Sequence, residues 1–137
     1  MTPPEDAAII THTLELAAER GGDLTAAIYA RLFRDHPALE PLFIMDTNGA
    51  VRGEMLSRAF DAILDFIGQR AYAHNFIGAE ATTHDGYNVP RDVFADFFAI
   101  IRDIVRENCA AAWSAEADSA WRRLLSDLSA YIAPAHA

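Results

Sequence analysis

The chain has 137 residues, of which 52% are hydrophobic and 23% charged, so one domain with a buried core is expected over residues 1–137. Its 20 acidic and 11 basic residues give a net charge of −9, and no run of lysine or arginine occurs, which argues against binding to nucleic acid or to an anionic membrane. A single cysteine excludes an intrachain disulfide and a cysteine-based zinc site.

The first half of the chain shows apolar residues at helical spacing. Thr2 stands before two prolines, which is typical of a helix cap, and Gly21–Gly22 ends this first helix. Asp23 is placed to cap a second helix, and His36–Pro37 ends it because the residue before a proline disfavours helical geometry. A short helical turn follows, and then a loop is predicted over residues 46–49.

The second half continues the helical pattern. A long helix is predicted from about Val51 to Tyr72, with Leu64 on its apolar face, followed by a weaker segment from Asn75 to His84. Pro90 suits the first position of the helix with the strongest apolar stripe, and Ser114 suits the cap of the last helix. No segment combines strand periodicity with hairpin residues, so the expected fold is all-α with six to eight helices of unequal length.

Features of membrane and exported proteins are also missing from the pattern. The N-terminal sequence MTPPEDAAII carries Glu5 and Asp6 where a signal peptide would be basic. The longest apolar stretches are interrupted by charged residues before they reach the length of a membrane span. We therefore expect a cytoplasmic protein.

Histidine is the residue type with the most chemical promise, because no phosphate loop, HExxH motif, ExxH pair or GxSxG elbow occurs. Four of the five histidines, His12, His36, His74 and His136, are expected to be surface or capping residues. His84 lies between two predicted helices, before a tight corner. One histidine cannot hold a bare zinc or iron ion, but it can bind an iron whose other ligands come from a porphyrin.

Three stretches show a family resemblance, in the right order and spacing: IYARLFRDHPALEPLF at residues 28–43, THDGYNVPRDVF at residues 83–94, and AW at residues 120–121. Over nearly its whole length the chain resembles the bacterial single-domain globins, which are similar to the haem domain of flavohaemoglobins. The resemblance implies a globin fold around a haem pocket. It also implies haem b (iron protoporphyrin IX), held noncovalently because no CxxCH motif is present.

The resemblance also assigns roles to individual residues. His84 matches the proximal iron ligand, Tyr29 the tyrosine on the opposite, distal side of the iron, and Phe43 the phenylalanine that packs on the haem ring. A haem slot needs an apolar lining, which five side chains can supply: Phe43, Leu56, Phe60, Phe94 and Phe98. The corner after His84 would let the imidazole point inward while Val89 returns to the core.

The register of the distal helix stays open. Spacing from Phe43 and from His84 places Arg52 near the gas ligand and Leu56 above the haem. A register three residues later would place Met55 and Ala59 there instead. Neither supplies the glutamine or histidine often found at the distal position, so Tyr29 would be the main source of distal polarity.

Three features depart from the flavohaemoglobin pattern. Phe94 occupies the place of a tyrosine that strengthens the proximal histidine, and His136 stands roughly where that family has a glutamate, so this relay is expected to be missing. Glu80 stands one turn before His84, in place of a leucine; it would point to solvent, or the helix would be irregular. We expect no reductase domain after Ala137, so any turnover would need a separate reductase.

These observations support three hypotheses. The first is a haem-b globin for oxygen binding or transport, or for binding another diatomic gas, which would support nitric-oxide dioxygenation if a separate reductase serves it. The second is a haem-based gas sensor that acts through a partner. The third is a globin-fold interaction module without haem. Exposed helical faces could also form a homodimer.

Overall fold

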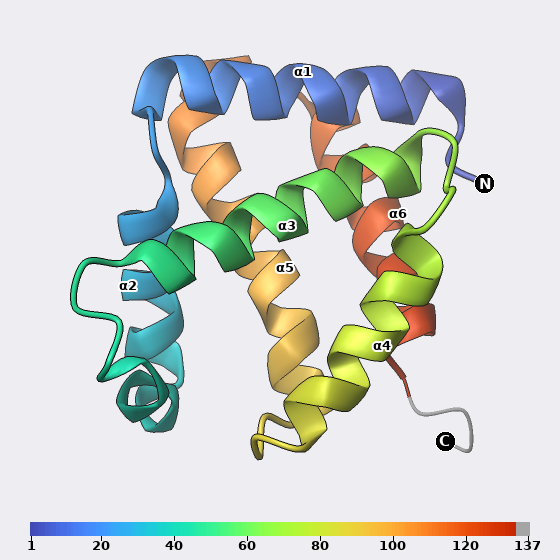
Figure 1. Ribbon diagram of the computed structural model, residues 1–137. Coiled ribbons are helices and arrows are strands. Elements are labelled where there is room, and N and C mark those ends of the chain that lie inside the picture. Colours follow the sequence, from blue (N-terminus) through green and yellow to red (C-terminus); the bar gives the residue numbers. More distant parts are fainter. Residues whose placement is uncertain (134–137) are drawn as a thin grey trace.

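The computed structural model describes residues 1–133, which form six α-helices and two short 3₁₀ helices, with no strand among them (Figure 1). In chain order they are α1 (Pro4–Gly21), α2 (Thr25–Asp35), η1 (Pro37–Phe43), α3 (Ala50–Ile67), α4 (Ala73–Asp85), α5 (Arg91–Cys109), η2 (Ala110–Ala112) and α6 (Ala115–Ile132). The expected all-α fold with six to eight helices is confirmed. Within residues 1–133, no helix is both long and apolar enough to cross a membrane.

Helix α5 forms the centre of the molecule. It packs against α1, α2, α4 and α6, and Figure 1 shows α3 crossing in front of it, with α2 and α4 to either side. Most of its predicted apolar stripe is buried: Phe98, Ile101, Ile104 and Val105 are each at most 4% exposed, while Phe94 and Phe97 at its start are partly buried. Burial of large aliphatic and aromatic side chains is the main stabilising contribution in such a core.

Of two predicted side-chain caps, Ser114 is confirmed: its Oγ accepts from the N–H of Ala117, three residues into α6. Asp23 lies one residue before the cap of α2, which is Leu24. It still accepts hydrogen bonds from the backbone N–H and the hydroxyl of Thr25, the first residue of α2. Both side chains satisfy a backbone donor that has no partner inside the helix.

Two other predicted helix starts are wrong by one residue. Pro3, not Thr2, is the cap of α1, and it makes no side-chain capping bond. The hydroxyl of Thr2 instead accepts a hydrogen bond from Arg70, 68 positions later. Pro90 is the cap of α5 rather than its first helical residue, with an extended ψ of 153°.

The predicted helix from Val51 to Tyr72 is too long, because α3 ends at Ile67. Asp65 explains the end: its carboxylate accepts from the backbone N–H groups of residues 71–73 and so begins α4 there. Arg70 supports the turn with a left-handed φ of 53°. Leu64, predicted to lie on the buried face, is 43% exposed.

Candidate functional site

A tight corner after α4 fixes the position of His84. The backbone carbonyl of His84 accepts from the N–H groups of Tyr87 and Val89, both at 3.0 Å, while Asn88 takes a left-handed φ of 61°. Val89 is 8% exposed, so the chain re-enters the core directly after the corner. Arg91 closes the corner by donating to Asp85.

The imidazole of His84 has one nitrogen engaged and the other available. Nδ1 lies 2.7 Å from the backbone carbonyl of Glu80, one turn earlier, and since a carbonyl only accepts, Nδ1 must carry the proton. Nε2 then carries a lone pair, and it forms no hydrogen bond to any residue in 1–133. A carbonyl partner on the second ring nitrogen is typical of histidines that bind a metal. The side chain is 22% exposed.

Glu80 neither points simply to solvent nor interrupts its helix. α4 is helical from Ala73 to Asp85, and the Glu80 side chain is 35% exposed. Its carboxylate oxygen Oε2 lies 3.9 Å from His84 Nδ1. The carboxylate is therefore a close neighbour of the imidazole, although too distant for a hydrogen bond.

Tyr29 lies on the buried face of α2 and is 2% exposed. Its ring packs against the rings of Phe33, Phe43 and Phe97, with centroid distances of 5.9, 5.5 and 5.5 Å. Its hydroxyl is buried and has no hydrogen-bond partner among residues 1–133. A buried hydroxyl without a partner costs free energy, and its proton is free to be donated.

A row of phenylalanine rings connects the two ends of the site. Tyr29 contacts Phe97 at 5.5 Å, Phe97 contacts Phe98 at 6.0 Å, and Phe98 contacts Phe94 at 5.8 Å. The ring of Phe94 lies 4.8 Å from the ring of His84. The fold thus brings residues from α2, α4 and α5 to one aromatic-lined region.

The start of α3 adds charge beside Tyr29. Arg52 donates to the carboxylate of Asp46 at 3.0 Å and to its backbone carbonyl at 2.9 Å. Burial raises the pKa of Tyr29; the positive charge of Arg52 opposes this and the negative charge of Asp46 adds to it. The tyrosine therefore stays protonated and can act as a donor.

The remaining α3 candidates differ in burial. Leu56 and Ala59 are 2% and 6% exposed, so each of the two proposed registers places one fully buried residue in the core. Met55 and Phe60 are partly buried. Burial alone does not separate the registers.

Asp46, Phe33 and Phe97 belong to this region but were absent from the candidate site residues. Asp46 lies in the predicted loop, and its position before a helix indicates a cap; it accepts from the N–H groups of Val51 and Arg52. Phe33 and Phe97 appear in the sequence only as members of apolar stripes. Nothing in helical spacing distinguishes a ring beside a hydroxyl from any other core ring.

The other histidines form different contacts. His36 pairs with Asp96 at 2.7 Å, His12 is exposed, and His136 lies outside the described residues. His74 packs against Tyr131 at 6.2 Å, and its Nδ1 is buried without a partner. Among residues 1–133, no group of three or more histidine, cysteine or acidic side chains could hold a bare metal ion.

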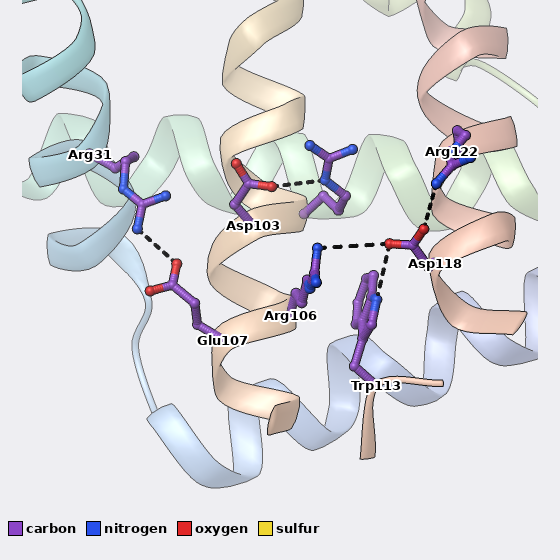
Figure 2. A network of polar contacts seen from close by, with 8 residues as sticks. Arg31, Asp103, Arg106, Glu107, Trp113, Asp118 and Arg122 are labelled. Atoms are coloured by element: carbon purple, nitrogen blue, oxygen red, sulfur yellow. Dashed lines mark hydrogen bonds and ion pairs between the residues drawn. The ribbon is translucent and has the colours of Figure 1, made fainter. Parts of the chain in front are cut away.

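A separate polar network lies on the surface of α5 and α6 (Figure 2). Asp118 accepts from the indole N–H of Trp113 and pairs with Arg122, and these contacts hold the pKa of its carboxyl below the usual value. Arg106 approaches the same carboxylate at 3.9 Å. The groove beside these residues measures about 460 Å³ and is lined by none of the candidate site residues.

The side chains of this region have the chemistry that an apolar cofactor with a metal centre requires. It offers a free imidazole nitrogen at one end, an unpartnered hydroxyl at the other, and apolar rings between them. Comparison with curated proteins found no match, and comparison with solved structures found none either. The family model described as Globin matches residues 26–132. The chain therefore belongs to the globin family, whose members bind haem and diatomic gases.

Proposed function

We propose that this globin binds haem b, with His84 as the iron ligand, and uses it to bind oxygen or another diatomic gas. The observation that carries the proposal is the pairing of His84, whose Nε2 is free, with Tyr29, whose buried hydroxyl has no partner. Haem would supply the iron to which the gas binds.

Each residue has a distinct task in this proposal. The carbonyl of Glu80 holds the Nδ1 proton of His84 and so orients Nε2 toward the iron. The hydroxyl of Tyr29 donates a hydrogen bond to a polar diatomic ligand. Phe43, Phe94 and Phe98 line the haem slot and keep water out, while Val89 anchors the corner.

For the distal helix we propose the register with Arg52 near the ligand and Leu56 above the haem, rather than Met55 and Ala59. The charge of Arg52 supports this choice, because it opposes the rise that burial causes in the pKa of Tyr29. Asp46 would keep the guanidinium in place.

We further propose that the chain functions like the haem domain of bacterial flavohaemoglobins, as a cytoplasmic single domain over residues 1–137. A separate reductase would then allow nitric-oxide dioxygenation. Phe94, which packs on His84, has no hydroxyl to strengthen the histidine, and this favours gas binding over peroxidase-like chemistry.

Haem titration of the purified protein tests the central assignment. The wild type is expected to bind one haem and show an intense Soret absorption band, and His84→Ala should lose or greatly alter that band. His12→Ala replaces an exposed histidine on α1 and is the matched control, expected to behave like the wild type. A wild-type protein that stays colourless would refute the proposal and leave a haem-less interaction module.

A second experiment separates gas binding from enzymatic turnover. Haem-loaded, oxygenated protein is mixed with nitric oxide and a cellular extract as the source of electrons, and nitrate is measured over many equivalents. Nitrate that continues to form beyond one equivalent supports dioxygenation. Formation that stops at one equivalent leaves oxygen binding, transport or sensing.

A further inference from the structure

The chain places a carboxylate, as well as a backbone carbonyl, beside the proposed iron ligand His84. Two atoms of Glu80 approach His84 Nδ1: the backbone carbonyl oxygen at 2.7 Å and the carboxylate oxygen Oε2 at 3.9 Å. The carbonyl accepts the one hydrogen bond that Nδ1–H can donate. The carboxylate therefore acts on the imidazole through its charge rather than through a hydrogen bond.

Within the part of the chain that the structure describes, no arginine or lysine pairs with this carboxylate. Among residues 1–133, the only ion-pair contact of Glu80 is its approach to His84. Arg91 is bound by Asp85, Thr82 and the carbonyl of Ile132. The negative charge on Glu80 therefore faces the imidazole without a competing partner.

The surroundings preserve part of this charge effect. The ring of Phe94 lies beside the imidazole, 4.8 Å between ring centroids and tilted by 50°, and replaces water on that side with an apolar ring. The Glu80 side chain is only 35% exposed and that of His84 only 22%. Charges that are partly shielded from water interact more strongly and are screened less by salt than fully exposed ones.

We propose that Glu80 is a positioning residue that acts through His84 to lower the midpoint potential of the haem iron. A negative charge near Nδ1 makes the imidazole a stronger electron donor and stabilises the more positive ferric iron relative to the ferrous iron. This inference rests on the proposed haem binding at His84. The carboxylate that acts on His84 would then come from α4, the helix that also carries His84.

The test is a spectroelectrochemical titration of the haem-loaded protein. Glu80→Gln removes the charge and keeps the shape, and it should shift the ferric–ferrous equilibrium about tenfold toward ferrous, a rise of about 59 mV. The iron–histidine stretching frequency of the ferrous protein should fall in the same variant. Glu15→Gln, which removes an exposed carboxylate from α1, is the matched control and should change neither value.

Glu80→Ala provides a second way to remove the charge, should the glutamine variant bind haem poorly. A midpoint potential that stays at the wild-type value in either haem-loaded variant would overturn the inference. Its failure is distinct from failure of the proposed function: the first leaves a Soret band that depends on His84, and the second leaves either no Soret band or one that His84→Ala does not alter.

Discussion

At the residue scale, the candidate site depends on two side chains with opposite hydrogen-bonding states. Nδ1–H of His84 donates to a backbone carbonyl, so the neutral imidazole has its lone pair on Nε2, the tautomer that binding a metal through Nε2 requires. Tyr29 is buried among three phenylalanine rings with its hydroxyl unpaired. Phenylalanine would fill nearly the same space without leaving a hydroxyl unpaired.

Tyr29→Phe tests the role of this hydroxyl in two ways, because the substitution should stabilise the haem-free protein but weaken oxygen binding in the haem-loaded protein. In the haem-free protein the variant should gain about 1 kcal/mol in the free energy of unfolding, because an unsatisfied buried hydroxyl is removed. In the haem-loaded protein it should release oxygen about tenfold faster, because a hydrogen bond to the ligand is lost. Denaturant unfolding and stopped-flow oxygen release provide the two values.

Tyr87→Phe is the matched control for this pair of measurements, because Tyr87 lies in the corner after His84 and is 64% exposed. It should change neither the free energy of unfolding nor the oxygen release rate. A Tyr29→Phe protein with a wild-type release rate would contradict the distal role of the hydroxyl.

At the element scale, the position of His84 depends on where α4 begins. Asp65 accepts from three successive N–H groups, of Ala71, Tyr72 and Ala73, and thereby orients the first turn of α4. The hydrogen bond from Tyr72, together with the other two, lowers the pKa of the Asp65 carboxyl. A single side chain at the end of α3 thus sets the direction of the helix that carries the proposed iron ligand.

Asp65→Ala should therefore loosen the start of α4 without unfolding the protein. Backbone amides of residues 71–73 are expected to exchange with solvent several-fold faster, and haem should dissociate faster than from the wild type. Hydrogen-exchange mass spectrometry and haem transfer to an acceptor protein measure these rates. Asp61→Ala removes an exposed carboxylate one turn earlier in α3 and should leave both rates unchanged; equal rates for the two variants would refute the role of Asp65.

The elements themselves could be predicted from the sequence, because helical spacing and short-range caps are local signals. Ser114 caps α6, and Asp23 accepts from the first residue of α2, through contacts within three residues that the sequence pattern indicates. The end of α3 could not be predicted, because Asp65 reaches six to eight residues ahead. The prolines after Thr2 predict a cap there, but the hydroxyl binds Arg70 instead, and a contact over 68 positions leaves no local signal in the sequence.

The same limit applies to the candidate site. The burial of Tyr29 and the corner after His84 follow from spacing and from the globin resemblance. The row of rings through Phe97 does not, because it depends on how α2 and α5 pack. The approach of the Glu80 carboxylate to His84 also depends on a rotamer that the sequence does not specify.

At the scale of the whole molecule, acidic side chains hold distant helices together. Asp6 accepts two hydrogen bonds from Arg123, at 2.7 and 2.9 Å, and joins α1 to α6. The bond from Arg123 holds the pKa of Asp6 below its usual value, and Asp46, Asp65 and Asp118 are shifted in the same direction. These groups bind protons less readily in the folded than in the unfolded chain.

Stability should consequently depend on pH in the acid range. A carboxyl with a depressed folded-state pKa contributes stability above its unfolded pKa, about 3.9 for aspartate, and loses it as the pH falls through the folded value. Thermal unfolding should show a nearly constant midpoint between about pH 7 and about pH 5, and a falling one below about pH 4. Asp6→Asn cannot titrate at this position, so it should be less stable at neutral pH and less sensitive to acid. A midpoint that rises on acidification below about pH 4 would contradict the sign.

The most direct test of the whole account is chemical rescue of the proposed iron ligand. His84→Gly removes the imidazole and leaves space for a free one, so the haem-loaded variant should lose the wild-type Soret spectrum and regain it when imidazole is added. The same addition should leave the wild-type spectrum unchanged. If His84→Gly keeps the wild-type spectrum without imidazole, the iron is bound elsewhere and His84 is not its ligand.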